Sequence, residues 1–67
     1  MKPWLVTLTH FEQVLGEGLV NAANVQHCRS KLNDELDLAK YPQRPLRIFI
    51  EAAAGTDKHV LEEEIIV

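Results

Sequence analysis

The stretch PQRPLRIFIEA (residues 42–52) divides the chain into two parts with different hydrophobic periods. Before it, from Phe11 to Leu38, apolar residues recur at helical spacing. From Leu46 onward they recur at every second residue, as in a strand with one buried face. Both prolines disfavour helix in the residue that precedes them, so a loop falls where the period changes. The sequence therefore predicts an α+β fold.

Two further strands are predicted around the strand Leu46–Ala52. Residues 4–8 are aromatic, β-branched and short, which is typical of a strand. Residues 59–67 end in Ile65, Ile66 and Val67 and are predicted to form the returning strand, after a turn at residues 55–58. A short C-terminal helix behind Thr56 or Asp57 is the alternative, because the glutamates at 62–64 favour helix.

The helical part of the chain has a possible start at Thr9. Glu12 follows three residues later, which is the spacing of a capping box and predicts a helix that begins at His10. Gly16 and Gly18 weaken this helix, since each costs about 1 kcal/mol relative to alanine in a helix interior.

Two interpretations of the glycines remain open. In one, a single helix runs from residue 10 to about residue 38. In the other, which we favour, a first short helix ends near Gly16 and a longer one begins behind Asn21 or Asn24, both good N-caps. Residues 25–38 are the firmest helix prediction in either case.

The predicted order is β-α-β-β. It gives a small three-stranded mixed sheet covered on one face by one helix, which the glycines break into two in the favoured interpretation. The strands at 46–52 and 59–67 would form an antiparallel hairpin. The strand at 4–8 would run parallel to 46–52 through a right-handed crossover. We expect residues 1–67 to form one small domain.

Composition sets the stability and the class of the domain. The 67 residues are 46% hydrophobic and 25% charged, with a net charge of −3, which is typical of a globular protein and not of a general nucleic-acid binder. A core of this size rarely supplies more than about 3–5 kcal/mol. Cys28 is the only cysteine, so a disulfide within these residues is excluded. We therefore expect support from a homodimer or from a partner protein.

No stretch approaches the roughly 18 apolar residues that a membrane-spanning helix needs. The apolar stretch near the N-terminus is also too short for a signal peptide. We expect a cytoplasmic protein without a membrane partner, in which the lone thiol stays reduced.

The second face of the predicted sheet carries the candidate interaction residues. If Leu46, Ile48 and Ile50 face the helix, Phe49 points to the other side together with Leu5. The same alternation leaves Ile66 beside Glu62 and Glu64. An exposed apolar patch among charges is typical of a protein interface, so we expect the interface to comprise Phe49, Ile66, Glu62 and Glu64.

Catalytic, cofactor and metal sites are not expected. The histidines at 10, 27 and 59 are scattered, and His27 and Cys28, as neighbours on a helix, would diverge by about 100°. Zinc needs about four ligands at suitable spacing, which the chain does not offer. In a strand, Glu63 would point away from Glu62 and Glu64, so the three acids cannot converge.

A basic segment supports an alternative function. Residues 27–47 hold most of the cations, with a tyrosine that could stack on a base: Arg29, Lys31, Lys40, Tyr41, Arg44 and Arg47. Asp34, Glu35 and Asp37 lie close by in sequence and weaken this field.

The leading hypothesis is a small non-enzymatic interaction or regulatory protein, such as an inhibitor, an adaptor or an antitoxin-like protein. It would bind a partner protein through a sheet face, an edge strand or the acidic hairpin. The alternative is a nucleic-acid-binding protein that uses the basic segment.

Overall fold

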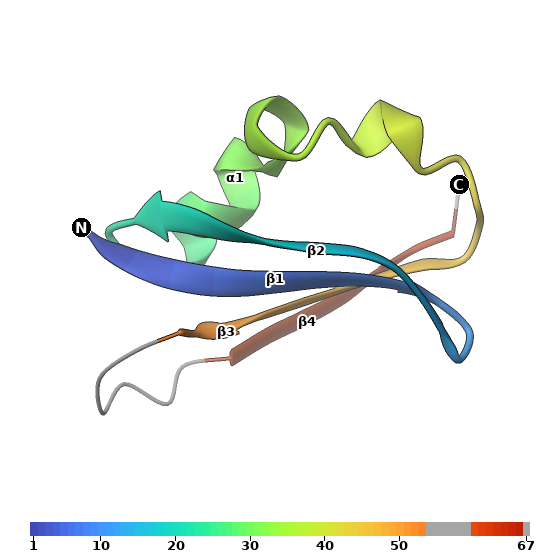
Figure 1. The fold of residues 1–67 in the computed structure, drawn as a ribbon, viewed down its shortest axis with the longest axis horizontal. Helices are drawn as coiled ribbons and strands as arrows, with labels where there is room; N and C mark the ends of the chain where they lie inside the picture. Colours follow the sequence, from blue (N-terminus) through green and yellow to red (C-terminus); the bar gives the residue numbers. More distant parts are fainter. Residues whose placement is uncertain (54–59, 67) are drawn as a thin grey trace.

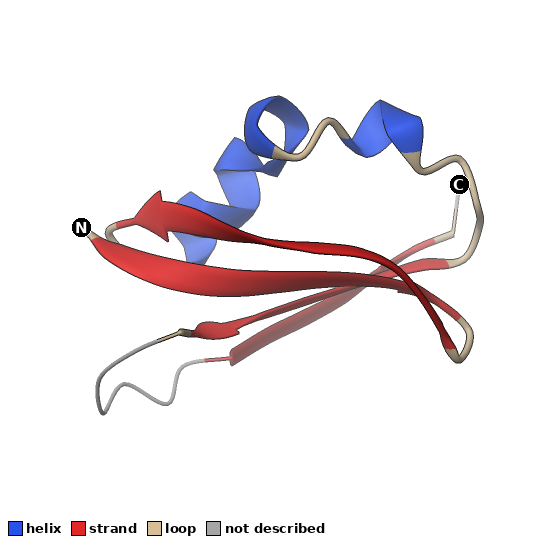
Figure 2. Cartoon of the chain, viewed as in Figure 1, coloured by secondary structure: helices blue, strands red, loops and turns tan. Residues whose placement is uncertain are grey.

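A computed structural model describes residues 1–53 and 60–66 and shows an antiparallel sheet with its helices on one face (Figure 1, Figure 2). Within these residues the elements run in the order β1 (Lys2–His10), β2 (Gln13–Ala22), α1 (Val25–Glu35), a 3₁₀ turn (Leu38–Lys40), β3 (Leu46–Ala52) and β4 (Val60–Ile65). The strand order is β2-β1-β3-β4. The α+β class predicted from the hydrophobic periods is confirmed.

The predicted three-stranded mixed sheet is wrong, because the segment read as the first part of a helix is strand β2. Every strand pair is antiparallel in the four-stranded sheet that the described residues form. The added strand reverses the chain once more, so β1 and β3 run antiparallel where a parallel crossover was predicted. The order is β-β-α-β-β.

A tight turn at Phe11 and Glu12 replaces the predicted helix start. Thr9 lies within β1, opposite Val14 of β2 and Arg47 of β3, so its spacing from Glu12 is not a capping box. Phe11 has a φ of 55°, in the left-handed region that allows the chain to reverse. The hairpin also has a β-bulge, because Leu8 pairs with Gly16 and Thr9 with Val14.

Gly16 and Gly18 let the helical layer lie close to β2. A Cβ atom on Gly16 would stand 2.7 Å from the hydroxyl oxygen of Tyr41, and one on Gly18 would stand 3.1 Å from a methyl carbon of Leu36. The absence of a side chain at the two glycines therefore makes room for Tyr41 and Leu36, which follow α1. In a strand interior such glycines mark a close approach of another segment.

Of the favoured interpretation, the start of the longer helix behind Asn24 is confirmed, whereas the first short helix ending near Gly16 is wrong, because Gln13–Ala22 is strand β2. The side-chain oxygen of Asn24 accepts a hydrogen bond from the His27 N–H at 2.8 Å. The helix ends at Glu35, earlier than the predicted residue 38, and Asp37 follows with a left-handed φ of 49°. The prolines at 42 and 45 lie in the predicted loop before β3.

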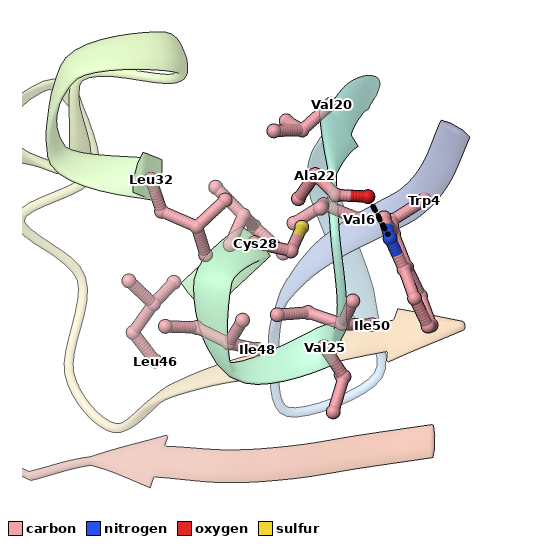
Figure 3. Close-up of a cluster of buried hydrophobic side chains, with 11 residues drawn as sticks. Trp4, Val6, Val20, Ala22, Val25, Cys28, Leu32, Leu46, Ile48 and Ile50 are labelled. Atoms are coloured by element: carbon pink, nitrogen blue, oxygen red, sulfur yellow. Dashed lines mark hydrogen bonds between the residues drawn. The ribbon is translucent and has the colours of Figure 1, made fainter. Parts of the chain in front are cut away.

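The core lies between the sheet and α1 (Figure 3). Inward residues alternate along β1, β2 and β3, and α1 adds three residues at helical spacing. The buried residues are Trp4, Val6, Leu8, Val20, Ala22, Val25, Cys28, Leu32, Leu46, Ile48 and Ile50. The indole N–H of Trp4 donates to the Ala22 carbonyl oxygen at 3.1 Å, so the largest side chain is fully buried with its polar atom paired.

The C-terminal strand prediction is confirmed for Val60–Ile65, and the alternative helix is wrong there. Its pairing with β3 places Leu61 and Ile65 on the helix side of the sheet. The predicted turn at 55–58, and the ends of the predicted strand at His59 and Val67, lie outside the described residues.

Candidate interaction surface

The sheet face opposite α1 is not covered by any helix within the described part of the chain (Figure 1). Cross-strand register assigns the side chains of this open face, since residues opposite one another point to the same side. In chain order the open face comprises Pro3, Leu5, Thr7, Thr9, Val14, Glu17, Leu19, Asn21, Arg47, Phe49, Glu51, Val60, Glu62 and Glu64.

Three apolar residues form a continuous path across the open face. Leu19 of β2 lies directly opposite Leu5 of β1. Phe49 of β3 lies opposite Thr7 and is therefore a diagonal neighbour of Leu5. Leu19 is 66% exposed, whereas Leu5 and Phe49 are half-buried by their neighbours. This Leu19–Leu5–Phe49 path leaves apolar surface on the side of the sheet that has no covering layer.

Acidic side chains stand on both sides of the path. Glu17 precedes Leu19 by two residues on β2, and Glu51 lies opposite Leu5 on β3. Glu62 lies opposite Phe49 on β4. Among the described residues, neither Glu17 nor Glu51 makes an ion pair or a side-chain hydrogen bond.

Arg47 is the one cation on the described strands of this face, and it is already paired. Its guanidinium nitrogens lie 3.2 Å from a carboxylate oxygen of Glu62 and 3.8 Å from one of Glu64. Among the described residues, the carboxylates of the open face therefore outnumber its cations, and the uncompensated charge of these residues is negative.

The predicted interface residues are placed in three ways. Phe49 lies on the open face beside Glu62, and Glu64 lies further along β4 on the same face. Ile66 is 71% exposed, but it follows the end of β4 and pairs with no strand. Glu63 points to the helix side, where Arg29 reaches it.

Sequence reasoning missed Leu19, Glu17 and Val14 because it assigned their segment to a helix. A signal was available in the alternation itself. Gly16, Gly18, Val20 and Ala22 form a row of small or apolar residues at every second position. This pattern is typical of a strand whose inward side chains are small, so that another layer can pack close to its backbone.

The basic residues of the alternative hypothesis do not form one surface. The Arg29 guanidinium binds the Glu63 carboxylate at 2.7 Å, which ties α1 to β4. The Lys31 ammonium donates to the Asn21 carbonyl oxygen at 2.6 Å and lies 3.8 Å from Glu35. Arg47 lies on the opposite side of the sheet from both.

Two of the three loop residues of that set, Tyr41 and Arg44, make contacts within the chain. The Arg44 guanidinium donates to the Tyr41 carbonyl oxygen at 2.7 Å. The Tyr41 ring packs over Gly16 and against the core, so its face is partly covered. Lys40 is exposed at the end of the 3₁₀ turn.

Cys28 is buried in the core, and the imidazoles of His10 and His27 contact backbone groups. Cys28 is fully buried, and this burial raises the pKa of its thiol, with a smaller opposing effect from the Lys31 charge. Nδ1 of His27 accepts from the Ala23 N–H at 3.1 Å, and Nδ1 of His10 lies 3.1 Å from the Pro45 carbonyl oxygen. The three groups do not converge.

The described residues form no metal-ligand cluster, no pocket and no membrane-spanning helix. No group of three or more His, Cys, Asp or Glu side chains is arranged to hold a metal ion. No pocket opens in the surface that these residues form. None of their helices has the length and apolar character to cross a bilayer.

Comparisons with protein-family models, with curated protein sequences and with solved structures gave no significant match.

Proposed function

We propose that the chain is a small non-enzymatic interaction protein that binds a partner protein through the open face of its sheet. The observation that carries the proposal is the Leu19–Leu5–Phe49 path on a face that no described helix covers. A sheet normally buries each apolar face against another layer. Contiguous exposed apolar surface is characteristic of binding sites.

Two further features favour the face over the edges of the sheet. The outer strand β4 carries Glu62, Glu63 and Glu64, and charged side chains are a common protection against strand addition. The other outer strand, β2, is interrupted by the bulge near Leu15. We therefore assign the binding role to the face and the acidic residues of β4 to its rim.

The proposal includes a regulatory role, as an inhibitor, adaptor or antitoxin-like protein in the cytoplasm, where the buried Cys28 thiol stays reduced. A homodimer through the same face is the second candidate. It would bury the exposed Leu19, but it would also bring the acidic rims of two copies together. Nucleic-acid binding stays a prediction, and the ion pairs of Arg29 and Arg47 do not favour it.

The test compares capture of partners by matched variants. Tagged wild-type protein is incubated with lysate of the source cells, and retained proteins are quantified by mass spectrometry. In the double variant Leu19→Thr/Phe49→Thr the path becomes polar, while threonine preserves strand propensity. The control is Phe11→Asn, which removes a hydrophobic residue outside the face that is about as exposed as Leu19, and asparagine tolerates the left-handed turn position.

We expect a partner that wild type and Phe11→Asn retain equally and that the double variant loses. Circular dichroism and Trp4 fluorescence verify that all three proteins are folded. Equal capture by the double variant would contradict the proposal. Retained nucleic acid that is released as salt rises would favour the basic segment instead.

A further inference from the structure

We propose that the occupant of the open face is a cationic amphipathic helix of a partner protein. This inference rests on the proposed function and specifies the chemistry of the partner. The helix would place an apolar stripe on the Leu19–Leu5–Phe49 path and lysine or arginine side chains on either side of it.

The width of the path fits a single helix. The path crosses β2, β1 and β3, and neighbouring strands are about 4.8 Å apart, so it spans about 10 Å across the sheet. An α-helix with its side chains is about 10 Å wide. The covered face of the same sheet provides the precedent, because α1 packs there through Val25, Cys28 and Leu32 at helical spacing.

The flanking carboxylates determine the charge of the partner. Glu17 lies on one side of the path and Glu51 on the other, and neither is paired within the described residues. Helix residues that border an apolar stripe lie next to these positions. Lysine or arginine there would meet a carboxylate that no described residue pairs, whereas an acidic residue would be repelled.

The same charges disfavour the other occupants of an apolar face. In a homodimer through this face, the glutamates of one copy would lie against those of the other and repel them. Arg47, the cation on the described strands of this face, is already paired with Glu62 and Glu64. Nucleic acids and anionic lipid surfaces carry the same sign of charge as the rim. A partner with positive charge on both sides of an apolar stripe is the complementary surface.

The test uses a synthetic probe and the full chain. The probe is a peptide of about 18 residues made of leucine and lysine, with leucine at i, i+3, i+4 and i+7 so that one face is apolar. A peptide of the same composition in scrambled order removes the stripe. A leucine–glutamate peptide with the original pattern reverses the charge. Binding is measured by calorimetry, and its location by amide chemical shifts of the ¹⁵N-labelled chain.

Two charge variants separate the open face from general attraction. Glu17→Gln/Glu51→Gln neutralises the carboxylates beside the path. Glu12→Gln/Asp34→Asn removes the same charge from exposed positions in the turn and on α1. Because solvent screens ion pairs at the surface, we expect the first variant to weaken binding about three- to ten-fold and the second to change it less than about two-fold.

The inference is supported if the leucine–lysine peptide shifts the amides of Leu5, Leu19 and Phe49 and the two controls do not. It is overturned if both charge variants weaken binding equally, or if the leucine–glutamate peptide binds as well. A homodimer in sedimentation velocity that Leu19→Thr/Phe49→Thr dissociates would also overturn it, because the occupant would be a second copy.

The capture experiment keeps this inference separate from the proposed function. Loss of a natural partner on Leu19→Thr/Phe49→Thr, without binding of the cationic peptide to the face, would leave the proposed function standing and refute the inference. Capture that ignores Leu19 and Phe49 would refute the proposed function itself.

Discussion

The Tyr41 ring lies directly over Gly16, with its hydroxyl oxygen 2.7 Å from the position that a Cβ atom would occupy. Their contact joins the segment after the 3₁₀ turn to strand β2. In an ordinary strand, alanine is preferred to glycine by about 0.5–1 kcal/mol. Here the added methyl group displaces an aromatic ring that packs against the core.

We expect Gly16→Ala to destabilise the protein by about 1–3 kcal/mol, the usual cost of overpacking. In a Tyr41→Ala background the same substitution should be neutral or stabilising, because the ring is gone. Urea unfolding followed by the single tryptophan, Trp4, measures the four proteins of this double-mutant cycle. An equal effect of Gly16→Ala in both backgrounds would show that the Tyr41 ring is not the reason why alanine is unfavourable at position 16.

The N-cap of α1 gives a second prediction. Asn24→Ala removes the acceptor of the His27 N–H and should cost about 1 kcal/mol in the free energy of unfolding. Asn33→Ala is the matched control, since Asn33 is exposed within the same helix and alanine has the higher helix propensity. A loss of stability as large in Asn33→Ala would contradict the capping role.

The ion pair between Arg29 and Glu63 is predicted to contribute little. Its side chains are 25% and 42% exposed, so solvent screens the attraction. We expect a coupling energy of about 0.2–1 kcal/mol from a double-mutant cycle with Arg29→Met and Glu63→Gln, and a smaller value at raised salt. A coupling energy that does not respond to salt would indicate a geometric role for the pair.

Cys28 gives a prediction on pH. Burial raises the pKa of its thiol in the folded state, so the folded chain holds the proton more tightly than the unfolded chain. The stability from this difference is fully present below the ordinary thiol pKa of 9.0 and is lost as pH rises above it.

Urea unfolding at pH 7 to 10, for wild type and Cys28→Ala, isolates the thiol from other groups that titrate in this range. We expect the stability of wild type to fall more steeply above pH 9.0 than that of Cys28→Ala. A thiol reagent should also react only when the chain opens, so its rate should increase with urea. Parallel pH curves for the two proteins would contradict the assigned shift.

Sequence reasoning predicted the elements whose patterns have one physical explanation. Ile48 and Ile50 alternate with Phe49 in the only way that a strand with one buried face allows, so β3 and the outward position of Phe49 were predictable. The start of α1 was predictable to within Asn21 or Asn24, because each side chain offers an acceptor before an apolar helical stripe, and the structure selects Asn24.

The alternation in strand β2 did not by itself decide the prediction, because the residues of β2 fit both a strand period and a helical period. Val14, Gly18 and Ala22 recur at helical spacing, while Gly16, Gly18 and Val20 recur at every second position. The contacts that go with the strand period come from Tyr41 and Leu36, which lie far along the chain and pack over the two glycines, and from pairing with β1. The part of the candidate surface on β2, including Leu19 and Glu17, was missed for the same reason.

The central claim is that the uncovered sheet face binds a partner protein, and amide chemical-shift mapping with the captured partner tests it most directly. The ¹⁵N-labelled chain is titrated with that partner, and shifts are assigned along β1, β2, β3 and α1. We predict shifts concentrated at Leu5, Thr7, Leu19 and Phe49, with α1 unaffected. Shifts confined to α1 and residues 40–45, with the open face unchanged, would contradict the claim.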